Sequence, residues 1–206
     1  MTRKLHFTTG MILLAFIVSH FSVHLFALAG PEAHIAALEV VQGIYRNPVI
    51  EPLLVAAILV QVVLGIRLVI RRWSEPDKGF WGKAQLASGL YLAFFMLNHT
   101  TAALYTRYVG GLETNFWWVA GPLQHPMMVW FFYPYYTLAV LAVAAHVGAA
   151  LHYRWGKPRA AKVALGAGIF VAAAYLLSFG GWLYPVATKP EYRAYYDAIL
   201  ASMGIS

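Results

Sequence analysis

The chain has no cysteine, and only 11% of its 206 residues are charged. The missing cysteines exclude disulfides, thiolate zinc sites, iron–sulfur ligation and covalent c-type haem attachment. Soluble domains carry about 25% charged residues, whereas hydrophobic residues make up 61% of this chain. A soluble fold of this length could not bury so much apolar surface, so we expect much of that surface to face lipid.

Acidic residues are also scarce, with eight against fifteen basic residues and a formal net charge of +7. The basic residues form short clusters between apolar segments instead of lining one polar face. This distribution is not typical of a nucleic-acid-binding surface, so we expect no nucleic-acid partner.

Five apolar segments reach the length of about 20 residues that a membrane-spanning helix needs. They cover residues 7–29, 52–70, 84–104, 127–151 and 163–183. Backbone polar groups in lipid must be satisfied within the segment, which favours α-helices. The sequence therefore predicts one all-α membrane domain over residues 1–206, with a short interfacial helix in the tail, 190–206. We expect the first segment to be a true span and not a cleaved signal, because it is long and contains His20 and His24.

The basic residues predict the orientation, because the cytoplasmic side of a membrane protein is enriched in lysine and arginine. Ten fall near one set of span ends and four near the other. The ten are Arg3, Lys4, Arg71, Arg72, Lys78, Lys83, Arg154, Lys157, Arg159 and Lys162; the four are Arg46, Arg107, Lys189 and Arg193. We therefore expect a multi-pass protein of the cell's inner (cytoplasmic) membrane with the N-terminus inside and the C-terminus outside.

A shift of 79 residues superposes the first span on the third. Gly10 then falls on Gly89, and His20 falls on His99. The second and fourth spans match more loosely, with Gln61 opposite His146. The pattern predicts an internal two-helix repeat, helices 1–2 and 3–4, followed by a fifth helix.

Four histidines lie within the spans: His20, His24, His99 and His146. Ionisable side chains inside a membrane are costly and usually functional. They are typical of haem b with two axial imidazoles, of a zinc or di-iron site, or of a proton relay. Zinc needs three or four ligands at one depth, and di-metal sites need carboxylates, which the spans almost lack. A haem b site needs only two facing imidazoles and an apolar pocket, so we favour haem b among these alternatives.

Helical rise predicts which histidines pair. His20 and His99 each lie about fifteen residues, or roughly 21 Å, from the inner ends of their spans, so one planar ligand could bridge them. His146 lies roughly 12 Å from the inner side, opposite Gln61. That inner level predicts a second haem, a quinone pocket or a structural hydrogen bond.

Haem propionates are anionic and need polar or basic partners. The candidates are His24, Arg46, Tyr105 and Arg107 at the outer level, and Arg67, Arg71, His152 and His6 at the inner level.

Two short motifs carry a family resemblance. Residues 6–10 (HFTTG) with His20 resemble the first-helix motif of the membrane cytochrome b subunits of succinate dehydrogenase and fumarate reductase. Residues 61–67 (QVVLGIR) resemble the second-helix motif of that family, although Gln61 stands at the position of a haem-ligating histidine and Phe7 replaces an arginine. The chain is similar, more weakly, to a five-helix haem-binding family of mitochondrial membranes.

The resemblance implies haem b held by His20 and His99, with His146 as a ligand of a second haem. It also implies electron transfer between a quinone pool and a peripheral flavoprotein and iron–sulfur partner on the inner face, so the chain would be one subunit of an oxidoreductase and not catalytic alone. The alternatives are a stand-alone haem-binding protein in haem handling or redox sensing, and a transporter or assembly factor whose histidines relay protons.

Overall fold

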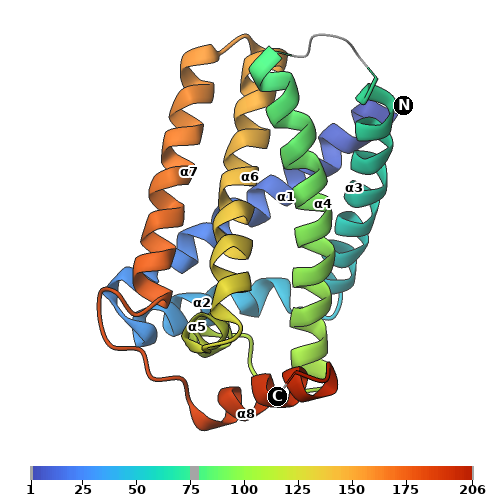
Figure 1. The fold of residues 1–206 in the computed structure, drawn as a ribbon. Coiled ribbons are helices and arrows are strands. Elements are labelled where there is room, and N and C mark those ends of the chain that lie inside the picture. The colour runs from blue at the N-terminus through green and yellow to red at the C-terminus, as the bar shows by residue number, and fades with distance from the viewer. Residues whose placement is uncertain (1, 75–78, 206) are drawn as a thin grey trace.

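The computed structural model describes residues 2–74 and 79–205, and the regular structure of these residues is entirely helical. Five long helices cover most of each predicted span (Figure 1). They are α1 (Thr2–Leu25), α3 (Ile50–Arg72), α4 (Gly79–Tyr108), α6 (Val129–Trp155) and α7 (Pro158–Phe179). The shorter elements are η1 (Phe26–Ala29), α2 (Pro31–Tyr45), α5 (Phe116–Gln124) and α8 (Pro190–Ser202).

Four of the helical segments are long and apolar enough to cross a membrane, which confirms the prediction of a multi-pass helical membrane protein. These segments are Thr2–Ala29, Ile50–Arg72, Val129–Trp155 and Pro158–Phe179. The predicted third span, 84–104, lies within α4, which packs against both α3 and α6. The fifth crossing and the internal repeat stay predictions.

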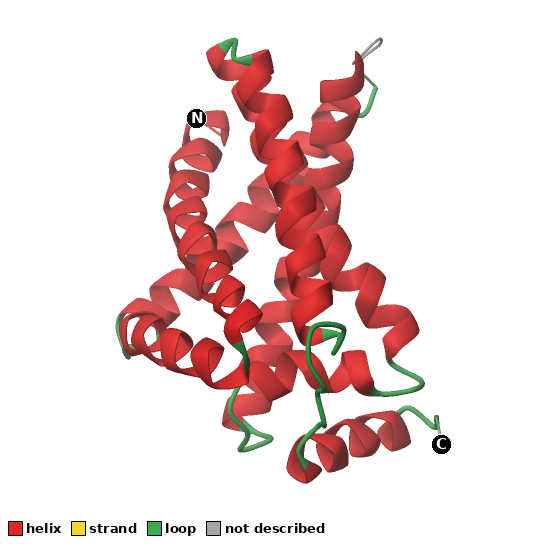
Figure 2. Cartoon of the chain, turned by 90° about the vertical axis from the view of Figure 1, so that its left-hand side faces the viewer, coloured by secondary structure: helices red, strands yellow, loops and turns green. Residues whose placement is uncertain are grey.

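The short helices α2, α5 and α8 lie across one end of the bundle, as Figures 1 and 2 show from two sides. The C-terminus lies at that end, and the N-terminus lies at the opposite end with the turn between α6 and α7 (Figure 1). The structure therefore gathers the predicted inner residues Arg3, Lys4 and Arg154 at one end. Lys78, which belongs to the same prediction, lies outside the described residues.

Local signals explain where the short helices begin. Gly30 has a φ of 114°, and Pro31 occupies the first turn of α2, where its missing N–H costs nothing. Asn115 caps α5 by accepting a hydrogen bond from the Trp117 N–H at 2.9 Å. These signals precede segments too short to span a membrane, which is why the search for spans did not predict α2 and α5.

The tail helix α8 is present at Pro190–Ser202, within the predicted range. Two of its tyrosines point into the protein and are buried. Tyr192 donates a hydrogen bond to the Glu113 carbonyl at 2.8 Å, and Tyr196 donates one to the Trp118 carbonyl at 2.5 Å. These bonds attach α8 to α5 and to the loop before it, so α8 closes one end of the bundle.

Candidate functional site

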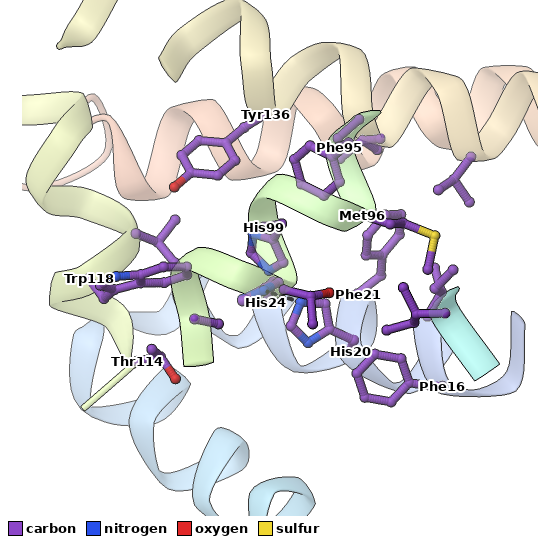
Figure 3. Close-up of a pocket in the computed structure, with 18 of the residues that line it drawn as sticks. Phe16, His20, Phe21, His24, Phe95, Met96, His99, Thr114, Trp118 and Tyr136 are labelled. Atoms are coloured by element: carbon purple, nitrogen blue, oxygen red, sulfur yellow. Dashed lines mark hydrogen bonds between the residues drawn. The ribbon is translucent and has the colours of Figure 1, made fainter. Parts of the chain in front are cut away.

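A cavity lies between the long helices, at the end covered by α2 and α5 (Figure 3). Three of the four predicted histidines, His20, His24 and His99, line it. Most other lining residues are aromatic or aliphatic. The aromatic members are Phe16, Phe21, Tyr45, Phe95, Trp118, Tyr136, Tyr175 and Phe179. The cavity is therefore apolar, with imidazoles in its wall.

His20 on α1 and His99 on α4 face one another, with their ring centroids 6.2 Å apart and their planes at 68°. Each ring stacks on an aromatic residue one turn earlier in its own helix. Phe16 lies 5.6 Å from His20, and Phe95 lies 5.0 Å from His99, measured between centroids. The helices α1 and α4 thus place equivalent aromatic–imidazole pairs beside the same cavity.

A chain of three imidazoles leads from α2 to the cavity. His24 Nδ1 is 2.8 Å from His34 Nε2, and His24 Nε2 is 3.1 Å from His20 Nε2. The sequence analysis missed His34 because it lies on α2, outside the predicted spans. Its side chain is 0% exposed. Burial, with a smaller effect from His20, lowers the pKa of His34 to about 4, so His34 is neutral at pH 7.

The two ends of this chain have unused hydrogen-bonding capacity. A neutral imidazole has one donor and one acceptor nitrogen. The two hydrogen bonds therefore use two donors and two acceptors of the three rings, which leaves one of each. The remaining atoms are Nδ1 of His20 and Nδ1 of His34, both buried without a hydrogen-bond partner in the described part of the chain. Buried polar atoms usually have partners, so His20 Nδ1 is available to a ligand.

One ion pair lies in the wall of the cavity, and a second lies beside it through Thr114. Arg107 donates a hydrogen bond to Glu51, which also accepts one from the Tyr108 hydroxyl at 2.6 Å. Arg46 pairs with Glu113 at 2.6 Å and donates to Thr114 Oγ1 at 2.9 Å. Arg46 and Arg107, the two predicted propionate partners, thus lie at the same end of the bundle as the cavity, each with a carboxylate beside it.

The two ion pairs differ in burial, and this predicts different costs of breaking them. The Glu51 side chain is 14% exposed and that of Glu113 is 65% exposed. Arg107→Leu leaves a mostly buried carboxylate unpaired, so we expect it to lower the free energy of unfolding by about 3 kcal/mol. Arg46→Leu leaves a solvated carboxylate, and we expect a loss of about 1 kcal/mol. Thermal unfolding in detergent measures both; equal losses would contradict the comparison.

The remaining predicted residues lie elsewhere. His146 is outside the cavity, at the inner level, and the ring that faces it is His6, at 6.5 Å between centroids. Gln61, predicted to lie opposite His146, instead contacts Thr9 Oγ1 at 2.6 Å and His6 Nε2 at 3.4 Å. The pairing differs because the first turns of α1 bring His6 between α3 and α6. Arg67 is exposed on α3.

A second cavity shares His99, Trp118 and Tyr136 with the first. It extends between α5 and α6 toward α8, whose residues Tyr195, Tyr196, Ile199, Leu200 and Met203 line its far side. His99 therefore lies in the wall between the two apolar cavities.

Comparisons of the chain with protein-family models, with curated proteins and with solved structures find no match. Across residues 2–74 and 79–205, no three His, Asp or Glu side chains are arranged to hold a metal ion. The geometry of the imidazoles and of the cavities beside them is therefore what indicates a function.

Proposed function

We propose that this protein binds haem b in the membrane and transfers electrons, with His20 and His99 as the two axial ligands. The observation that carries the proposal is the facing of these two rings across an aromatic cavity. When bound, haem supplies a one-electron redox centre. The protein's own residues would hold the haem iron, exclude water from the haem and orient the two imidazoles.

The separation of the two rings fits an iron between them. Metal–imidazole bonds of about 2.0 Å, with each nitrogen about 1.1 Å from its ring centre, give centroids roughly 6 Å apart. The observed separation is 6.2 Å. One nitrogen of His20 is held by His24 and the other is buried without a partner among the described residues. Metal-ligating imidazoles have this arrangement, in which the second nitrogen fixes the ring.

The charge of the site also favours haem over a bare metal ion. Among the described residues, the one acidic side chain in the cavity wall is Glu51, which is paired with Arg107. A divalent ion held by neutral imidazoles would be an uncompensated buried charge. A porphyrin dianion neutralises ferrous iron, so neutral ligands suffice. Arg107 and Thr114 in the cavity wall, with Arg46 bonded to Thr114, would then meet the propionate edge.

The second cavity supports quinone as the electron donor or acceptor. It is apolar, as a lipid-soluble ring requires, and it shares His99 with the proposed haem site. A peripheral flavoprotein and iron–sulfur partner would dock at the opposite end of the bundle, where Arg3, Lys4 and Arg154 gather. A basic surface suits an acidic partner. In this proposal the chain is one subunit of an oxidoreductase and not catalytic alone.

The proposal includes five crossings, with α4 as the third, and the N-terminus in the cytoplasm. Cysteine labelling tests this orientation cleanly because the chain has no cysteine. Ser74→Cys, after α3, should react with an impermeant maleimide only after the cells are opened. Ser202→Cys, at the end of α8, should react in intact cells. The reverse pattern would invert the orientation, and labelling of both in intact cells would contradict an odd number of crossings.

A reduced-minus-oxidised spectrum of the purified protein is the direct test of the function. We expect a b-type band, and we expect a short-chain quinol to reduce it. The absence of any b-type band would contradict haem binding. It would therefore exclude both the electron-transfer role and the stand-alone role in haem handling or redox sensing. A band that no quinol reduces would leave the stand-alone role as the better explanation.

The imidazole chain from His34 through His24 to His20 favours a second candidate function, a proton relay in a transporter or assembly factor. Imidazoles linked through both nitrogens can pass a proton along the chain. Proteoliposomes without haem that collapse an imposed pH gradient, and that lose this activity in His24→Phe, would favour the relay over electron transfer.

A further inference from the structure

His34 is a buried imidazole that lies beside the proposed haem site and outside its cavity. It is on α2, and it lines neither of the two cavities described above. Its ring is nearly parallel to that of His24, with the centroids 5.0 Å apart and the planes at 7°. Phe116 of α5 and Phe179 of α7 pack against it at 5.8 Å and 5.2 Å between centroids. Three other helices therefore fix the position of this side chain.

The chain that leads from His34 to His20 consists of imidazoles alone. Metal-ligating imidazoles usually donate their second N–H to a carboxylate, a carbonyl or water, each of which accepts that hydrogen bond. The partner of His20 is instead His24, at 3.1 Å between the two Nε2 atoms. Within the described ranges, no carboxylate pairs with any of the three rings. An imidazole can donate or accept, so His24 alone does not determine which nitrogen of His20 carries the proton.

Three neutral rings joined by two hydrogen bonds allow two orders of protons. In the first order, His20 donates to His24 and His24 donates to His34, so the second nitrogen of His20 has a free lone pair. In the second order, both hydrogen bonds run the other way, and the second nitrogen of His20 carries a proton. A neutral imidazole binds a metal through its unprotonated nitrogen, so an iron at His20 requires the first order.

His34 must accept a hydrogen bond in the first order. Its Nε2 lies 2.8 Å from His24 Nδ1. Burial lowers the pKa of His34 to about 4, so the ring is neutral at pH 7 and has one acceptor nitrogen, whereas a protonated ring would have none. The two ends of the chain, His20 Nδ1 and His34 Nδ1, both lack a partner among the described residues. Metal binding at His20 would leave one of these buried atoms unsatisfied instead of two, which favours the first order.

We infer that His34 is a positioning residue for the proposed haem ligand His20, and that it acts through His24 by accepting the hydrogen bond that keeps the second nitrogen of His20 unprotonated. This inference rests on the proposed function and deepens it. It adds to the site a residue that neither lines the cavity nor belongs to a predicted span.

The test is haem affinity, measured by titration of haem into the full-length apoprotein in detergent. His34→Leu removes the acceptor, and we expect the affinity to fall about 10–100-fold, as is typical when a metal ligand loses its outer partner. His34→Gln should keep an affinity close to that of the unsubstituted protein, because its amide oxygen reaches the position of Nε2 and accepts the same hydrogen bond. His34→Asn is too short to place an acceptor there, so it should behave as His34→Leu does.

His152→Leu is the matched control. It removes another imidazole whose Nδ1 is buried without a partner in the described part of the chain. His152 lies on α6, stacked on Trp81 at 5.7 Å between centroids, and does not belong to the chain of three imidazoles. We therefore expect no change in haem affinity. Thermal unfolding of the haem-free proteins shows whether each variant is folded before haem is added.

The midpoint potential is a second readout, which a role in packing alone would not move in the same pattern. Without an acceptor for its own N–H, His24 is a weaker acceptor for His20. His20 is then less basic and stabilises ferric iron less. At saturating haem, we expect a higher midpoint potential in His34→Leu and His34→Asn, and the unsubstituted value in His34→Gln.

The outcomes separate this inference from the proposed function. Unchanged affinity and potential in His34→Leu and His34→Asn would overturn the inference and leave the proposed function intact. Equal losses in all three His34 variants would also overturn it, because the whole ring would then be needed and not its acceptor nitrogen. Absence of haem binding by the unsubstituted protein would contradict the proposed function, and the inference with it.

Discussion

We expect the replacement of His99 by alanine to remove one b-type haem from the purified protein. His99 is the only histidine on α4, so no imidazole of the same helix can take its place. Of the proposed pair, His20 alone would then hold the haem iron, and one imidazole would hold it more weakly than two. We therefore expect the haemochrome ratio to fall by one equivalent and the low-spin signal of the outer haem to disappear.

His20→Ala tests the proposed haem ligand on α1. On this helix another histidine is close enough to replace it. His24 lies one turn further along α1, with its ring centroid 4.4 Å from that of His20. We expect His24 to rescue a single His20→Ala change at a shifted height, whereas His20→Ala combined with His24→Ala should lose the outer haem completely. Retention of the full low-spin signal in both His99→Ala and the double variant would falsify the outer pairing.

Gly168→Ala should destabilise the protein although it adds only one methyl group. Gly168 is buried where α7 packs on α6, and a Cβ there would lie 2.2 Å from the Cβ of Ala144. Neither backbone can move without disturbing the most extensive helix contact in the protein. Overpacking of this kind costs about 1–3 kcal/mol, and a lower midpoint of thermal unfolding in detergent would measure it.

Gly166→Ala is the matched control on the same helix, two residues earlier. Its added Cβ would meet nothing within 4 Å. Alanine has a higher helix propensity than glycine by about 1 kcal/mol, so we expect a small gain in stability. The two substitutions are chemically identical, and equal effects on the unfolding midpoint would show that the α6–α7 contact is looser than described.

The long helices were predictable because each contains a run of apolar residues long enough to require lipid, and composition alone reveals such a run. The facing of His20 and His99 followed from helical rise, since both lie at the same distance from the inner ends of parallel spans. Distance along a helix axis is sufficient to predict both features, and the sequence specifies that distance directly.

The contacts around His34 and His6 were not predictable in the same way. His34 lies on a helix that runs across the bundle, and no periodicity in the sequence gives the direction of that helix. His6 and Gln61 come from different helices, and their contact depends on how α1 is inclined against α3. Such crossing geometry results from side-chain packing between helices, which a single sequence does not specify.

The two imidazole pairs lie at different heights in the bundle. Ser88, which holds His146, and His99 are eleven residues apart on α4, so the pairs differ by roughly 16 Å along that helix. This is about half of the ~30 Å hydrocarbon core. One elementary charge crossing the whole core works against about 2.3 kcal/mol per 100 mV. A charge that moved between the two pairs would work against about half of that, so the voltage across the membrane would bias its distribution between them.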